Sequence, residues 1–208
     1  MKHAVPQFHM PTPRAGRAAG GGPSGSGGQR RPGQSPPTSQ PLQPVTPGWT
    51  QVPGQAAPQH VRTAAQDFQP RYSGEPRPTT ASYNGQTITS GGGQRHLADD
   101  LAHERLRRDD GRPYPQAPNV LFEHPEMKVA ADLREQLRRN GTVADAEVVV
   151  DNSMCGTRPF DQNYPLTCDK LLADTMPAGS RMTVWSTLDG GATFYQNVIT
   201  GTGRLIRP

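Results

Sequence analysis

Cysteine is scarce in this sequence: Cys155 and Cys168 are the only two among 208 residues. Two cysteines are too few for a disulfide framework, but they can form one bridge or supply two ligands to a metal ion. Long apolar runs are also missing, and the first residues lack the apolar middle of a secretory signal. We therefore expect no membrane insertion, and any export to proceed without an ordinary cleavable signal in this chain.

Hydrophobic residues make up only 32% of the chain, whereas proline and glycine are abundant, with 23 of each. Residues 1–80 hold 15 of the prolines and 11 of the glycines. Such a segment has too little apolar surface to offset roughly 1–2 kcal/mol per residue of backbone ordering entropy. We therefore expect residues 1–80 to be a disordered linker rich in proline, glycine and glutamine, and residues 81–208 to form one folded domain.

Acidic residues are nearly absent from the same segment. Residues 1–80 carry 8 Lys or Arg against 2 Asp or Glu, whereas residues 81–208 carry 14 against 16. The positive net charge is therefore a property of the predicted tail. Global charge alone does not indicate that the folded domain binds nucleic acid.

Hydrophobic periodicity and turn residues predict alternating strands and helices after residue 80. We expect a strand or hairpin arm over 82–90, helices over 95–108 and 125–139, a valine-rich strand in "DAEVVVDNS", a short helix from "CDKLLADT", and two strands, "RMTVWST" and "ATFYQNVIT". The turn "LDGG" makes the last two strands antiparallel neighbours. This order predicts an α/β sandwich with a mixed sheet of about five strands.

The predicted helix over 125–139 carries a carboxylate on its apolar face. Pro125 in the first turn and Gly141 just past the end are typical helix boundaries. Glu126 lies four residues before Ala130, on the stripe that faces the core. A buried charge needs a partner or a proton. Alternatively, Glu126 occupies the first turn because the helix dipole favours anions there, and its side chain bends to water.

His124, two residues before this glutamate, is by itself most often a helix cap or a packed histidine, but the two cysteines add a second interpretation. Cys155 follows the valine-rich strand and Cys168 begins the next helix, whose dipole is expected to favour the Cys168 thiolate. One His and two Cys are three ligands of a tetrahedral zinc with an open fourth position, beside which Glu126 could shuttle a proton. The alternative is that the cysteines form a disulfide or are buried thiols.

Several further motifs occur in one order: "SYNGQT", "PYP", "HPE", "DNSMC" and "TCDKLLADTMPAGSRMTVW" followed by a hairpin. In this order they resemble the bacterial polymorphic-toxin deaminases, and within them the group that includes a toxin acting on cytosine in double-stranded DNA. The resemblance implies a cytidine deaminase-like α/β/α sandwich over about residues 80–208.

The same resemblance implies an activity. Zinc held by His124, Cys155 and Cys168 would activate water for attack on C4 of cytosine, and Glu126 would act as the acid and base. It further implies DNA as substrate, a cognate immunity protein as partner, and delivery of the protein as a secreted effector into the cytoplasm of a competing bacterium.

The chain departs from the family pattern between its cysteines, where twelve residues stand in place of the common two. This departure puts the first cysteine ligand in question, although a long loop can still bring its ends together at little entropic cost. The loop contains Arg158, Phe160 and Tyr164, which could stack a base and contact a phosphate, or could pack on the domain itself.

Two more residues are candidates for substrate contact. Tyr114 stands between two prolines and either lines the pocket or belongs to the core, and Asn84 either contacts the substrate or forms a turn in "YNG". Two alternatives to DNA cytosine deamination stay open: a deaminase of RNA, adenine or free nucleosides, and a secreted binding module held by a disulfide between the two cysteines.

Overall fold

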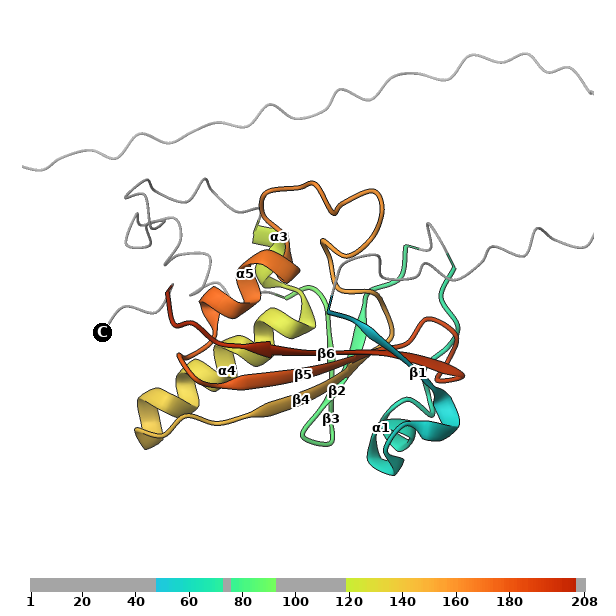
Figure 1. Cartoon of the computed structure of the whole chain (residues 1–208), viewed down its shortest axis with the longest axis horizontal. Coiled ribbons are helices and arrows are strands. Elements are labelled where there is room, and N and C mark those ends of the chain that lie inside the picture. Colours follow the sequence, from blue (N-terminus) through green and yellow to red (C-terminus); the bar gives the residue numbers. More distant parts are fainter. Residues whose placement is uncertain (1–47, 73–75, 93–118, 205–208) are drawn as a thin grey trace, which may run out of the picture. The chain divides into compact units, whose positions relative to one another are not determined.

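The computed structural model of the chain describes residues 48–72, 76–92 and 119–204 (Figure 1). All of them belong to one compact unit, residues 38–208. The elements, in chain order, are β1 (Thr50–Pro53), a 3-10 turn (Gly54–Ala56), α1 (Gln59–Ala64), β2 (Thr80–Tyr83), β3 (Gln86–Thr89), α3 (Asn119–Phe122), α4 (Pro125–Asn140), β4 (Ala146–Val150), α5 (Cys168–Thr175), β5 (Arg181–Ser186) and β6 (Thr193–Thr200). None of the helices in these ranges is long and apolar enough to cross a membrane.

The described strands form a six-stranded sheet in the order β1-β6-β5-β4-β2-β3. The central pair β4 and β5 is parallel, with Val148 opposite Val184, and every other neighbouring pair is antiparallel. The predicted mixed sheet and the antiparallel pairing of the last two strands are therefore confirmed. Because β4 and β5 are parallel, α5 and the long loop before it form the connection between them.

Helices cover both faces of this sheet, as Figure 1 shows with α4 and α5 on one side and α1 on the other. Along β4, Val148 and Val150 pack in the cluster that contains α4 and α5, whereas Val149 packs with α1. This alternation follows from the two-residue period of a strand. The predicted α/β/α sandwich is confirmed.

The helix α4 has the boundaries that its end residues indicate. Pro125 occupies its first turn, and Gly141 follows its end in the left-handed conformation, φ 67°, with its N–H bonded to the Leu137 carbonyl. A glycine adopts that conformation without the steric cost that a Cβ would bring. The prediction over 125–139 is confirmed, and the helix buries Glu126 together with its apolar residues.

The folded domain begins earlier than the predicted boundary at residue 81. The strand β1 pairs with β6, with Val52 opposite Phe194, and Val61 of α1 is fully buried in the cluster that contains Trp185 and Phe194. The composition of residues 1–80 as a whole does not reveal this segment. An edge strand and one short helix need few apolar residues when the surface on which they pack is supplied by a later part of the chain, here β5 and β6. Pro53 ends β1 at the sheet edge, where a missing N–H is tolerated.

The predicted strand or hairpin arm over 82–90 is a hairpin made of β2 and β3. Its turn residues Asn84 and Gly85 have φ of 50° and 72°, as a two-residue hairpin loop requires. The predicted helix over 95–108 lies outside the described residues, and so do residues 1–47 of the predicted linker.

Candidate metal centre

His124 is held at the start of α4 by the backbone on both sides of it. It is the N-cap residue, with an extended backbone (φ −71°, ψ 144°). Its N–H donates to the Leu121 carbonyl, and its own carbonyl accepts from Met127. Because Pro125 fixes the first helical φ, the backbone defines the position from which the imidazole projects at the helix N-terminus.

The two cysteines come together although twelve residues separate them. Cys155 lies in the loop after β4, and Cys168 is the first residue of α5. The backbone N–H of Cys168 donates to Sγ of Cys155 at 2.9 Å, and the N–H of Asp169 donates to the Cys155 carbonyl at 3.2 Å. The first and last residues of the long loop are therefore in direct contact at the N-terminus of α5.

Gly156, which the sequence interpretation did not single out, makes this contact possible. Its φ is +93°, and a Cβ on it would lie 1.6 Å from Oδ1 of Asp169 and 2.5 Å from Oγ1 of Thr167. A Cβ at this position would force the side chains of Asp169 and Thr167, or the loop itself, to move. A glycine directly after a predicted ligand was the one available signal of such a close approach.

One ligand atom from each of His124, Cys155 and Cys168 lies within 4.8 Å of the others, the one such group found among the described residues. Nδ1 of His124 is 3.2 Å from Sγ of Cys168, and both cysteines are free and buried. Ligand atoms around a tetrahedral zinc with bonds of roughly 2.0–2.3 Å lie about 3.3–3.8 Å apart. The His124–Cys168 separation lies close to this range, and one imidazole with two thiols is a donor set that suits zinc.

The two thiols differ in acidity. The hydrogen bond from the Cys168 side chain is the main cause that lowers the pKa of Cys155 to about 5, against the effect of burial, and contact with His124 lowers it further. Burial instead raises the pKa of Cys168 well above its usual value. We expected the α5 N-terminus to favour the Cys168 thiolate, but its first N–H points at Cys155. The thiolate that a metal ion requires is thus already favoured at Cys155.

His124 responds to the same neighbours. Burial lowers the pKa of its imidazole, but the hydrogen bond and the charge of Cys155 outweigh burial, and the net pKa is raised. A thiolate at Cys155 and an imidazolium at His124 therefore stabilise each other. A divalent cation in the same place would take over the role of that positive charge.

Glu126 is buried, at 3% exposure, in the first turn of α4. Burial raises the pKa of its carboxyl, while the charge of His124 acts in the opposite direction. The carboxyl is therefore close to the three ligand side chains without belonging to their group. Its predicted inward orientation is confirmed, and a carboxyl at such a place can accept and return a proton.

The loop between the two cysteines presents aromatic side chains to solvent. Phe160 is 60% exposed and Tyr164 is 59% exposed, so neither packs into the core. Nε of Arg158 donates to Asp161 at 2.7 Å, and its guanidinium lies 4.5 Å from the centre of the Phe160 ring. The charge of Arg158 also acts to lower the pKa of both His124 and Glu126, so this arginine contacts the Phe160 ring and acts electrostatically on the candidate centre.

The structure does not bring Asn84 to the centre. Asn84 forms the β2–β3 turn. This turn follows Tyr83, which pairs with Val148. The opposite end of β2 pairs with Val150, where the chain enters the loop that leads to Cys155. Asn84 lines a separate cavity of about 580 Å³ on the α1 face of the sheet. Tyr114 lies outside the described residues.

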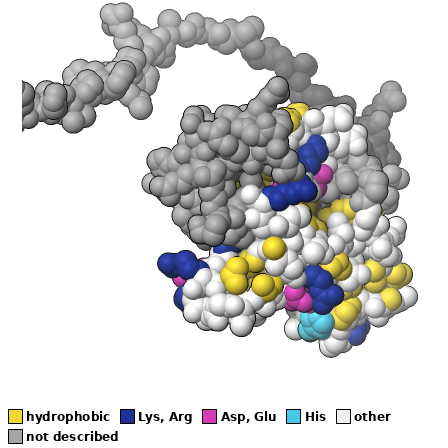
Figure 2. All heavy atoms as spheres, turned by 60° about the vertical axis from the view of Figure 1, so that its left-hand side comes forward, with side chains coloured by type: hydrophobic (Ala, Val, Ile, Leu, Met, Phe, Trp, Pro, Cys, Tyr) yellow, Lys and Arg dark blue, Asp and Glu magenta, His cyan; other side chains and the backbone are white. Residues whose placement is uncertain are grey.

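Among the described residues on the face shown in Figure 2, basic side chains do not form a continuous track. Lys and Arg occur there in small separate groups, several of them beside an acidic side chain.

The family described as SCP1.201-like deaminase matches residues 53–204, a range that begins in β1 and contains the three ligand candidates and Glu126. No curated protein matches the chain.

Proposed function

Because the chain belongs to the SCP1.201-like deaminase family, we propose that it is a zinc-dependent hydrolytic deaminase that converts cytosine to uracil in DNA. The observation that carries this proposal is the convergence of His124, Cys155 and Cys168 beside the buried carboxyl of Glu126. Membership in the family supports deamination. The donor set supports zinc, and the resemblance of the motifs to DNA-acting toxins supports the substrate.

In this proposal His124, Cys155 and Cys168 hold the ion, and zinc supplies Lewis-acid activation of water near neutral pH. The carboxylate of Glu126 takes a proton from the attacking water and passes it to the departing amino group. A C–O bond forms at C4 and the C–N bond breaks, so cytosine and water become uracil and ammonia. The raised pKa of Glu126 suits a group that must both accept and return the proton.

The loop between the cysteines is the proposed contact for the nucleic acid. Phe160 and Tyr164 are exposed and offer ring faces on which bases could stack. The guanidinium of Arg158 lies against the Phe160 ring and is ion-paired with Asp161, and its charge acts on Glu126. Exposed aromatic rings beside a deaminase centre favour a polymeric, unstacked substrate over a free nucleoside.

The direct test is uracil formation in single- and double-stranded oligonucleotides given the purified full chain loaded with zinc. Glu126→Gln should reduce the rate by roughly 10²–10⁴-fold, the usual contribution of a general acid and base. Glu135→Gln is the matched control, because Glu135 lies on the same helix, is bonded to Arg138 and should leave the rate unchanged. Uracil formed equally by the parent and by Glu126→Gln would refute the assigned role.

The same assay separates the alternatives within the enzyme class. RNA, adenine-containing DNA and free cytidine are run beside the DNA substrates, and product from one of these alone would replace DNA cytosine as substrate. The alternative of a binding module held by a disulfide has less support, because both cysteines are free thiols and the family is one of deaminases.

The biological role that we propose is that of a toxin delivered into competing bacteria and neutralised in its producer by an immunity protein. Expression of the parent in a bacterial host should inhibit growth and raise the frequency of C-to-T transitions. Glu126→Gln should do neither. Growth inhibition that persists in Glu126→Gln would separate toxicity from deamination and contradict this role.

A further inference from the structure

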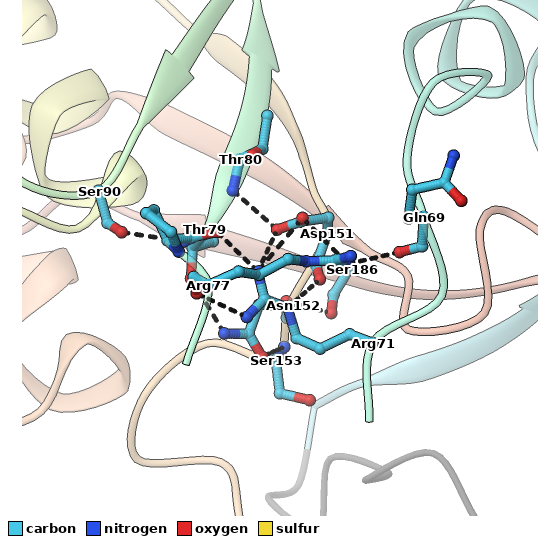
Figure 3. Close-up of polar contacts among 11 residues, drawn as sticks. Gln69, Arg71, Arg77, Thr79, Thr80, Ser90, Asp151, Asn152, Ser153 and Ser186 are labelled. Atoms are coloured by element: carbon cyan, nitrogen blue, oxygen red, sulfur yellow. Dashed lines mark hydrogen bonds and ion pairs between the residues drawn. The ribbon is translucent and has the colours of Figure 1, made fainter. Parts of the chain in front are cut away.

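The segment before β2 contributes a buried arginine to the loop that carries Cys155. The side chain of Arg71 is only 7% exposed, and its backbone N–H bonds to the Leu188 carbonyl at 2.8 Å. Its guanidinium donates to three carbonyl oxygens, those of Asp151 at 3.0 Å, Arg77 at 2.9 Å and Pro78 at 2.8 Å. Figure 3 shows this guanidinium among the residues that surround Asp151.

Asp151, the first residue after β4, is the centre of these contacts. Its carboxylate lies 3.2 and 3.3 Å from Nη2 of Arg71 and accepts the backbone N–H of Thr80 at 2.7 Å. Its own N–H donates to the Thr80 carbonyl at 2.9 Å. Arg77 adds a second cation at 3.5 Å. The carboxylate is thus buried with its charge compensated, as a buried ion requires.

The next residue is held from two further directions. The side-chain amide of Asn152 donates to Oγ1 of Thr79 at 2.9 Å, and its carbonyl accepts from Oγ of Ser186, at the end of β5, at 2.7 Å. The Asn152 side chain also accepts the N–H of Ser153. The chain therefore leaves β4 along a path set by groups that come from before β2 and from β5 (Figure 3).

Cys155 follows only four residues after Asp151, and Ser153 and Met154 between them are buried. A shift of the path at Asp151 is therefore transmitted to Sγ of Cys155, because a buried and hydrogen-bonded segment has little room to absorb it. The far end of the loop cannot compensate, because Cys168 is fixed as the first residue of α5.

We propose that Arg71, acting through Asp151, is a positioning residue for the metal centre: it fixes where Cys155 meets His124 and Cys168. The inference rests on the proposed function only in taking these three side chains as metal ligands. It assigns a role to a segment that composition alone places in a linker. The hydrogen bonds of the Arg71 side chain go to Asp151, Arg77 and Pro78 and to none of the three metal ligands, so its effect must appear in how the metal is held.

The test uses the zinc-loaded full chain with Arg71→Lys and Arg71→Gln. Lysine retains the positive charge beside Asp151 but lacks the planar guanidinium that reaches several carbonyls at once. Arg71→Lys therefore still tests the proposal if Arg71→Gln fails to fold. The release of zinc to a chromogenic chelator should be on the order of tenfold faster in both variants, the usual effect of groups that orient metal ligands. The absorption bands of the cobalt-substituted protein should also change, because they report ligand geometry.

Val61→Ala is the matched control, since Val61 is fully buried against the other face of the sheet and its loss lowers stability without touching the loop. Release rates and cobalt spectra of the Arg71 variants equal to those of the parent and Val61→Ala would overturn the proposal and leave Arg71 a purely structural residue. A parent chain that holds zinc but deaminates no substrate would refute the proposed reaction and leave this measurement valid. A parent chain that takes up neither zinc nor cobalt would overturn both.

Discussion

The backbone N–H of Cys168 points at Sγ of Cys155, 2.9 Å away. One hydrogen bond thereby joins the two ends of the long loop and places the first amide of α5 against the more acidic of the two thiols. The twelve-residue separation that set this chain apart from the common family pattern does not separate the sulfur atoms in space. Two aromatic side chains of this loop, Phe160 and Tyr164, are exposed and are free to contact a substrate.

Removal of the metal should destabilise the parent and leave a ligand variant unaffected. Metal bound only to the folded state adds about 4 kcal/mol of stability when its free concentration is 1,000 times the Kd. We therefore expect a chelator to lower the Tm of the zinc-loaded parent but not that of Cys168→Ser, which should hold less than a tenth of the parent's zinc. Thermal scans with and without chelator, together with zinc analysis, make the comparison. Equal scans for the parent in both conditions would contradict the metal centre.

Gly156→Ala should cost more than another glycine substitution at positive φ. The left-handed conformation alone costs an alanine roughly 1–2 kcal/mol, and Gly141→Ala, where nothing lies within 4 Å of the added Cβ, measures that cost. At Gly156 the Cβ would meet Asp169 and Thr167, so a larger loss and weaker zinc binding are expected. Denaturant unfolding and zinc titration of both variants test this, and equal losses would show that the close approach is unimportant.

The stability of the parent should fall between about pH 10 and 12 because of Tyr83. Burial, and then the hydrogen bond to Asp132, raise the pKa of Tyr83 to about 12. In the unfolded chain this phenol ionises near pH 10. The phenol therefore loses its proton first in the unfolded state. The contribution of Tyr83 to the free energy of unfolding, fully present below pH 10, is lost as pH rises toward 12.

Tyr83→Phe removes this contribution and serves as the comparison. The difference in Tm between the parent and Tyr83→Phe should shrink as pH rises from 9 to 12. A difference that stays constant over this range would mean that Tyr83 ionises at the same pH in the folded and unfolded states.

Phe160→Ala should weaken the use of a nucleic-acid substrate without affecting folding. Stacking of one base on an aromatic ring contributes about 1–3 kcal/mol, so kcat/KM on an oligonucleotide should fall roughly tenfold or more. The Tm should not change, because the side chain is 60% exposed. Val198→Ala, at a site that is 51% exposed on β6, is the control for removing an exposed apolar side chain. An unchanged kcat/KM in Phe160→Ala would show that Phe160 has no role in substrate binding.

Local signals in the sequence determined the features that depend on near neighbours. Pro125 and Gly141 mark the ends of α4, because a missing N–H and a positive φ act within one turn. The spacing of Glu126 from Ala130 directed the carboxylate inward, because helical periodicity acts over four residues. The turn "LDGG" likewise predicted the antiparallel pair β5 and β6.

Only the tertiary structure decided the features that join distant segments. Composition did not indicate β1, because this edge strand forms by pairing with β6, which lies about 140 residues later in the chain. Gly156 leaves room for the side chains of Asp169 and Thr167 where Cys155 and Cys168 meet, and this close approach exists only once α5 is in place. Arg71 and Asp151, 80 residues apart, form a buried ion pair that local pattern cannot indicate, because its compensation comes from groups that folding alone brings together.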